Sequence, residues 1–196
     1  MGPQHGATAL LAGAISYMLG ECNLLAPEEM SRPTPCARWD LNALLAHLAE
    51  SMADLEAVIR TGQLAAEDPP RPPDCGDPLE TLRDRAAELL CVCFGFCGDD
   101  QFVAVGGLPL PAVLVACTGA VEVAVHGWDV SAARGRRRPI PPRLAAPMLG
   151  LCPLIVAGRE GLFAGPVEVP AEASPGDRLV GFLGRDPELK LPTSSY

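Results

Sequence analysis

The chain has few aromatic residues, a single lysine, three histidines and no long uninterrupted apolar run. Aromatic side chains make up 5% of its 196 residues, whereas 48% of the residues are hydrophobic. The apolar content is carried mainly by Ala, Leu and Val, which favours closely packed helices over a sheet-rich fold. No apolar run reaches the roughly 18 residues that a membrane-spanning helix needs, so we expect no membrane contact.

Positive charge is also scarce. The formal net charge is −9, and basic residues gather in sequence only at Arg134 and at 136–138. Such a chain is poorly suited to bind a phosphate backbone, so we expect no nucleic-acid partner. The arginine cluster could hold the carboxylate of a substrate or cofactor, and we assign Arg134 to cofactor binding. The alternative is that these arginines complement the dipole of a preceding helix.

The eight cysteines are spread along a chain of medium length, unlike the dense framework of a small secreted protein. No basic stretch followed by a signal-like cleavage site begins the sequence, so we expect a cytoplasmic protein with reduced thiols. Cys91, Cys93 and Cys97 could hold a soft metal, but their spacing is not a standard zinc pattern and buried structural thiols are the alternative. Cys36 precedes a predicted helix, where either a lowered thiol pKa or a structural role is possible.

The spacing of apolar residues predicts an all-α fold in one domain spanning 1–196. The predicted helices cover 7–25, 41–59, 78 to about 95–98, 111–134 and 143–160, with a short helix at 177–184. Asp40 is a predicted N-cap, residues 101–111 have a β-like pattern that suggests a hairpin or an extended link, and 165–170 is predicted to be extended. Four main helices form a core over about 4–135, and about 136–190 is a C-terminal addition.

The fourth predicted helix is apolar almost all round but has a line of titratable residues. Glu122, His126 and Asp129 follow one another at spacings of four and three, which places them on one helical face. Ionisable groups on a buried helix are costly unless each is paired or bound to a metal. A glutamate and a histidine one turn apart can both reach one cation, so the helix predicts part of a metal site.

A third ligand must come from another segment. His5 lies in an N-terminus that we expect to be frayed, which leaves His47, at the border of the apolar stripe of the second predicted helix. Two histidines, one carboxylate and an open fourth position are typical of catalytic zinc. Asp129 would then orient His126 or transfer a proton, and we assign it as the catalytic residue. The alternative is that Glu122 and His126 form a simple helix pair and that His47 is a satisfied core histidine.

Three segments resemble one known family. TPCARWDLNALLAHL (34–48) resembles the T-P-C-x-x-W and L-x-x-H-L signature of the mycothiol-dependent maleylpyruvate isomerase family, within the DinB-like superfamily. GAVEVAVHGWDVSAARG (119–135) resembles its E-x-x-x-H-G-W-D segment, and GFLGRDP (181–187) resembles the G-R-x-P ending of its short members. The three motifs occur in the order and at the separations usual in that family, so the resemblance extends over nearly the whole chain.

The resemblance implies a DinB-like four-helix bundle that binds a divalent metal, usually zinc, through His47, Glu122 and His126. It also implies mycothiol or a similar thiol as cosubstrate and a small electrophile as substrate, in a short form without the separate C-terminal domain of the longer isomerases. We therefore expect a thiol transferase or isomerase, as a monomer or homodimer. The alternative is a metal-binding bundle that sequesters a small molecule or catalyses a non-thiol step in secondary metabolism. Trp39 and Trp128 are expected to wall the site, and we assign Trp128 to cofactor binding.

Overall fold

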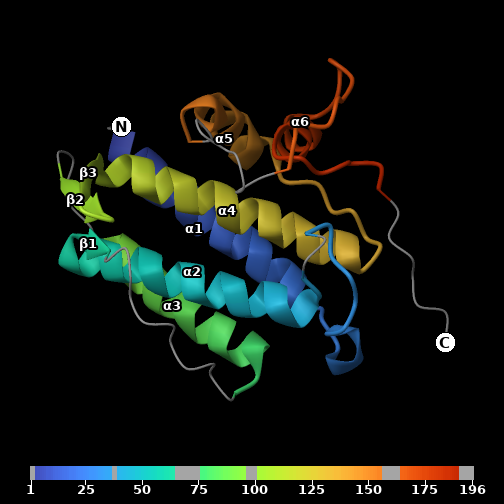
Figure 1. Ribbon diagram of the computed structural model, residues 1–196, viewed down its shortest axis with the longest axis horizontal. Helices are drawn as coiled ribbons and strands as arrows, with labels where there is room; N and C mark the ends of the chain where they lie inside the picture. Colours follow the sequence, from blue (N-terminus) through green and yellow to red (C-terminus); the bar gives the residue numbers. More distant parts are fainter. Residues whose placement is uncertain (1–2, 37–38, 65–75, 96–100, 156–163, 190–196) are drawn as a thin grey trace.

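The computed structural model describes residues 3–36, 39–64, 76–95, 101–155 and 164–189. The long helices of the described residues run along one another in a bundle, and shorter helices follow them in the chain (Figure 1). These are α1 (Pro3–Cys22), α2 (Leu41–Thr61), α3 (Pro78–Gly95), α4 (Ala112–Ala133), α5 (Pro142–Ile155) and α6 (Pro175–Phe182), with a 3₁₀ turn η1 at Pro27–Glu29. The mostly helical architecture confirms the all-α, DinB-like prediction.

A small sheet closes one end of the bundle. It consists of β1 (Gln63–Leu64), β2 (Phe102–Val105) and β3 (Leu108–Pro111). β2 and β3 form an antiparallel hairpin, so the β-like pattern over 101–111 corresponds to a hairpin, and β1 pairs with β2 in parallel. The two-residue β1 was not predicted, because a strand this short leaves no alternating pattern in the sequence.

The second helix forms where its sequence predicted. The Asp40 carboxylate accepts a hydrogen bond from the backbone N–H of Ala43, which confirms Asp40 as the N-cap. At the other end Gly62 adopts a left-handed conformation with φ 73°, which ends the helix and which glycine tolerates best. Leu41, Leu44 and Leu48 are fully buried, so the predicted apolar stripe faces the core.

The other helix ends differ from prediction by a few residues. α1 includes His5, which we expected in a frayed terminus, and it ends at Cys22 rather than residue 25 because a turn follows before Pro27. The described part of α5 ends at Ile155, and the predicted continuation to residue 160 lies outside the described residues. The predicted boundary near residue 135 falls in the connection between α4 and α5.

α4 lies at the centre of the bundle, where it packs along α1 and also contacts α2 and α5. By length and composition α4 alone, among the described helices, would be able to cross a membrane, although the sequence predicted no span. However, 72% of its most apolar stretch is buried inside the protein. A buried core helix meets the same criterion, so α4 is explained by its position in the bundle.

α1 packs tightly against α4 at Gly127. A Cβ atom added there would lie 2.9 Å from the Cα of Met18 and 3.2 Å from the Tyr17 ring, so the α1 backbone would have to move. We expect Gly127→Ala to lower the free energy of unfolding by about 1–3 kcal/mol, measured by urea denaturation. Gly150→Ala, in α5 with no atom within 4 Å of the added Cβ, is the matched control and should stabilise by about 0.4–1 kcal/mol. Equal effects of the two substitutions would contradict this account of the helix contact.

Candidate metal centre

The facing sides of α2 and α4 bring together the three predicted metal ligands. His47 Nε2 lies 3.0 Å from Glu122 Oε1, and one turn further along α4 His126 completes the group. One potential ligand atom from each residue lies within 4.8 Å of the others. Two imidazoles and a carboxylate at this separation form a candidate site for a divalent cation.

Glu122 is held in place by its neighbours as well as by its helix. Its Oε1 accepts a hydrogen bond of 2.8 Å from the Ser51 hydroxyl, in addition to the contact with His47. Burial alone would raise the pKa of Glu122, but the hydrogen bonds and the nearby imidazoles outweigh it and lower this pKa. Glu122 is therefore a carboxylate at neutral pH, which is the form that binds a cation. Ser51 was not predicted, although it lies four residues after His47 on the same face of α2.

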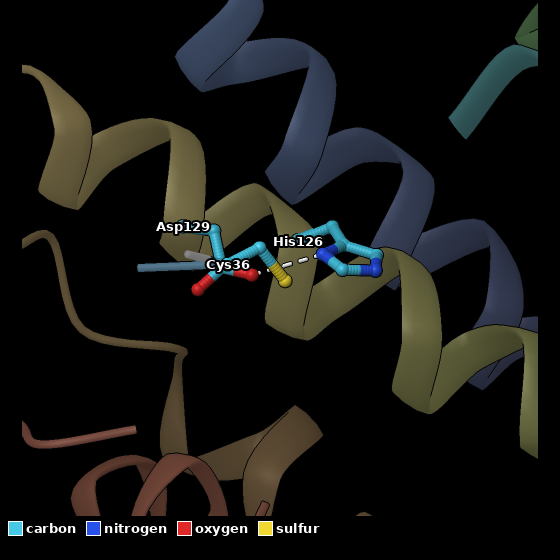
Figure 2. Close-up of side chains that lie close together, drawn as sticks. All are labelled: Cys36, His126 and Asp129. Atoms are coloured by element: carbon cyan, nitrogen blue, oxygen red, sulfur yellow. Dashed lines mark hydrogen bonds and ion pairs between the residues drawn. The ribbon is translucent and has the colours of Figure 1, made fainter. Parts of the chain in front are cut away.

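His126 is oriented by a buried carboxylate. Its Nδ1 lies 2.9 Å from Oδ2 of Asp129, which is fully buried (Figure 2). This is the contact expected from the three-residue spacing. A histidine whose one ring nitrogen bonds a carboxylate presents the other nitrogen, here Nε2, in a fixed direction and with greater basicity. Asp129 is thus placed to orient His126, and its assignment as the catalytic residue stays a prediction.

Arg185 supports Asp129 from the C-terminal part of the chain. Its Nη2 donates to Asp129 Oδ2 at 2.9 Å and its Nε donates to Oδ1 at 3.2 Å. Burial would raise the pKa of Asp129, but the hydrogen bond with His126 and the charge of Arg185 outweigh it and lower that pKa. Asp129 therefore stays ionised, and both of its oxygens accept hydrogen bonds. Such a carboxylate is better suited to position His126 than to transfer a proton. We did not predict this role for Arg185, although the G-R-x-P motif contains it.

Cys36 lies beside this ion pair, with its Sγ 3.2 Å from Nη2 of Arg185. Cys36, His126 and Asp129 form a second group of potential ligand atoms within 4.8 Å of one another (Figure 2). This second group is a poor cation site, because the Arg185 guanidinium already contacts both Cys36 and Asp129 and would repel a metal ion. The His47, Glu122 and His126 set has no arginine against it among the contacts that the structure describes.

Trp39 covers the histidines. Its ring centroid lies 4.3 Å from that of His47 and 5.9 Å from that of His126. The loop that holds Trp39 is tied by Thr34, whose hydroxyl lies within hydrogen-bond distance of the Trp39 carbonyl. Trp39 is therefore a wall of the site, as expected. Trp128 is 2% exposed and packs in the hydrophobic core, and its assignment to cofactor binding stays a prediction.

Arg134 is engaged at the end of α4. Its Nε donates to Oε2 of Glu29 at 3.2 Å, and its Nη2 donates to the carbonyl of Leu24. Its side chain is 7% exposed, and Arg32 binds the same carboxylate. The carboxylate that Arg134 holds in the structure is thus the protein's own, and its assignment to cofactor binding stays a prediction.

The cysteines of α3 do not converge. Cys91 is exposed, whereas Cys93 is buried, because neighbours two apart on a helix lie on different faces. Burial raises the pKa of Cys93 to about 11, so this thiol is protonated at neutral pH. Cys97 lies outside the described residues. The pair that the structure describes resembles structural thiols more than a soft-metal site.

A cavity of about 390 Å³, partly open to solvent, adjoins the candidate ligand Glu122. Ser51 and Glu122 belong to its wall, and the rest of the wall comes from α2, α4, the hairpin and the end of α5. Most of the lining is aliphatic, including Leu55, Val58 and Leu114. The volume is within the range typical of small-molecule sites.

Comparison with known proteins agrees with the motifs. Residues 11–131 match the mycothiol maleylpyruvate isomerase N-terminal domain family. Two curated relatives from Mycobacterium tuberculosis, the uncharacterized protein Rv0738 of strain H37Rv and the uncharacterized protein MT0763 of strain CDC 1551, are each 30% identical over 171 residues, which is 81% of this chain and 86% of the relative. No solved structure matches. On these grounds the chain belongs to the mycothiol maleylpyruvate isomerase N-terminal domain family.

Proposed function

We propose that the protein is a cytoplasmic, zinc-dependent enzyme that activates a low-molecular-weight thiol, mycothiol or a close analogue, for attack on a small electrophile. The observation that carries this proposal is the cluster of His47, Glu122 and His126 beside a cavity. Family membership and the oriented His126 support it.

A free thiol has a pKa near 8.5, so most of it is protonated at neutral pH, whereas the thiolate is the nucleophile. A divalent metal bound by the three residues would supply the positive charge that favours the thiolate form. Two neutral imidazoles and one carboxylate would leave that site with a net charge of about +1, which suits an anionic sulfur.

The chain's own residues prepare this chemistry. Ser51 and His47 fix the Glu122 carboxylate, and Asp129 fixes His126. Trp39 covers the two imidazoles, and the cavity next to Glu122 would hold the electrophile beside the candidate ligands.

The proposed reaction can be a transfer or an isomerisation, and both begin with the same step. The thiol loses its proton to solvent, and the sulfur lone pair forms a bond to the electrophilic carbon. In a transfer, the leaving group departs with the electron pair of its bond to carbon and takes up a proton. In an isomerisation, the π pair of a conjugated double bond shifts onto the carbonyl, the resulting single bond rotates, and the same thiolate is expelled.

Thermal unfolding with zinc alone, mycothiol alone and both together tests the proposal. At a thiol concentration of about 100 times Kd, binding stabilises the folded state by about 2.7 kcal/mol, a rise in Tm of roughly 5–10 °C for a chain of this size. We expect this rise only when zinc is present. The disulfide form of mycothiol, which has no thiol to ionise, is the control. An equal rise with mycothiol in chelator-treated protein would contradict a metal-activated thiol.

A further inference from the structure

We propose that Trp39 is a positioning residue of the metal centre, which holds the ring of His47 in place as Asp129 holds the ring of His126. The inference rests on the proposed function only in taking His47 as a metal ligand. It concerns the affinity for zinc and requires neither a thiol nor a substrate.

The two histidines of the metal centre differ in what supports them. His126 is 7% exposed, and its Nδ1 bonds the carboxylate of Asp129. The His47 side chain is 29% exposed, and its Nε2 faces Glu122. With the described residues, Nδ1 of His47 forms no hydrogen bond. The second nitrogen of a metal-binding histidine is normally held by a carboxylate, a carbonyl or water, so His47 lacks the support that the protein gives His126.

The indole of Trp39 supplies a different support for His47. The centroids of the two rings are 4.3 Å apart and their planes are inclined by 37°. The ring of His126 is farther from the indole, at 5.9 Å and 53°. Aromatic rings at the shorter distance are in van der Waals contact, so the imidazole of His47 cannot turn freely against the indole. The contact therefore restricts the direction in which Nε2 of His47 points.

The backbone of Trp39 is fixed on both sides. Its N–H donates to the carbonyl of Cys36 at 2.8 Å, and its carbonyl accepts from the N–H of Thr34 at 3.3 Å. Thr34 is itself buried. The next residue, Asp40, caps the helix that carries His47. Indole and imidazole thus belong to one tied unit, in which the ligand is oriented before a metal ion arrives.

Two substitutions of Trp39 test this role. Trp39→Leu keeps an apolar side chain without a planar ring, so we expect it to lower the zinc affinity at least about tenfold. Trp39→Phe is the matched control, because it retains a ring, and its affinity should stay within about threefold of the wild-type value. Competition with a chromogenic chelator, without thiol, measures both. Wild-type affinity in Trp39→Leu, or an equal loss in both variants, would overturn the proposal.

A combined variant identifies the histidine through which Trp39 acts. Cys36 of the same loop contacts Arg185, which binds Asp129, so the loop also reaches the support of the other histidine. If Trp39 acts through His47, Trp39→Leu should lower the zinc affinity by the same factor in Asp129→Asn with Arg185→Gln as in the wild type, because independent supports have additive free energies. No further loss in that background would overturn the proposal.

A measurement on the wild-type chain covers the case in which Trp39→Leu does not fold. The chain has three histidines, so their ring proton signals can be resolved by NMR and that of His47 assigned with His47→Gln. In chelator-treated protein the ring current of the indole should displace the His47 signal from its ordinary position, and an undisplaced signal would overturn the proposal. Zinc binding that depends on Trp39 without any stabilisation by mycothiol would refute the thiol chemistry and support the positioning role.

Discussion

Replacing His126 with Ala should remove stoichiometric zinc from the purified protein. His126 is 7% exposed, is oriented by Asp129 and belongs to the group of three potential ligands. Groups that only orient a ligand change metal affinity about 10–100-fold, so loss of a ligand itself should exceed about 100-fold. Elemental analysis of the purified protein measures the zinc content, and competition with a chromogenic chelator measures the zinc affinity. Zinc retained at one ion per chain in His126→Ala would refute the ligand set.

His126→Ala also leaves a cavity in the core, so a second ligand variant is needed. Glu122→Gln keeps the shape of the side chain and removes the charge, and it should lose zinc to a similar degree while remaining folded. Ser51→Ala is the matched control, because Ser51 only donates a hydrogen bond to Glu122. It should retain stoichiometric zinc with an affinity lowered at most about 10–100-fold. If Ser51→Ala and Glu122→Gln lost zinc equally, zinc binding would depend on the surroundings of Glu122 rather than on its carboxylate charge.

The sequence predicted the parts of this site that depend on helical spacing. α2 and α4 have clear periodicity and, for α2, a recognisable N-cap, so the faces that carry His47, Glu122 and His126 followed from the 3.6-residue repeat. The scarcity of histidine then left His47 as the remaining imidazole. Asp129 bonding to His126 followed from the same repeat, because residues three apart on a helix are neighbours.

The features that were missed depend on contacts between distant segments. Arg185 reaches Asp129 across 56 positions of sequence, and neither periodicity nor composition indicates which buried carboxylate an arginine will meet. The cavity is lined by residues of two helices, a hairpin and a helix end, so its lining depends on how these elements pack. Arg134 was assigned from its place just after a helix, but its actual contact, Glu29, lies 105 positions earlier.

The buried pair of Asp129 and Arg185 predicts a large effect on stability. Asp129 is fully buried and Arg185 is 8% exposed, so Asp129→Asn would leave a guanidinium without its counter-ion. Removing one partner of a buried ion pair costs about 3–5 kcal/mol. We expect that loss in urea unfolding at pH 7 with chelator-treated protein. The Asp129 pKa is lowered in the folded state, so its contribution is present above the ordinary carboxylate pKa of about 3.9 and is lost as the pH falls through the folded-state value.

A double variant separates the structural role of this pair from its role at the metal. Asp129→Asn with Arg185→Gln removes both charges, so most of the lost stability should return, because the unpaired buried cation is gone. Zinc affinity should stay lowered by about 10–100-fold in both variants, since neither gives His126 a carboxylate partner. If the double variant regained zinc affinity together with stability, Asp129 would matter only for folding. If stability returned while zinc affinity stayed low, Asp129 would be a positioning residue whose charge Arg185 makes tolerable in the core.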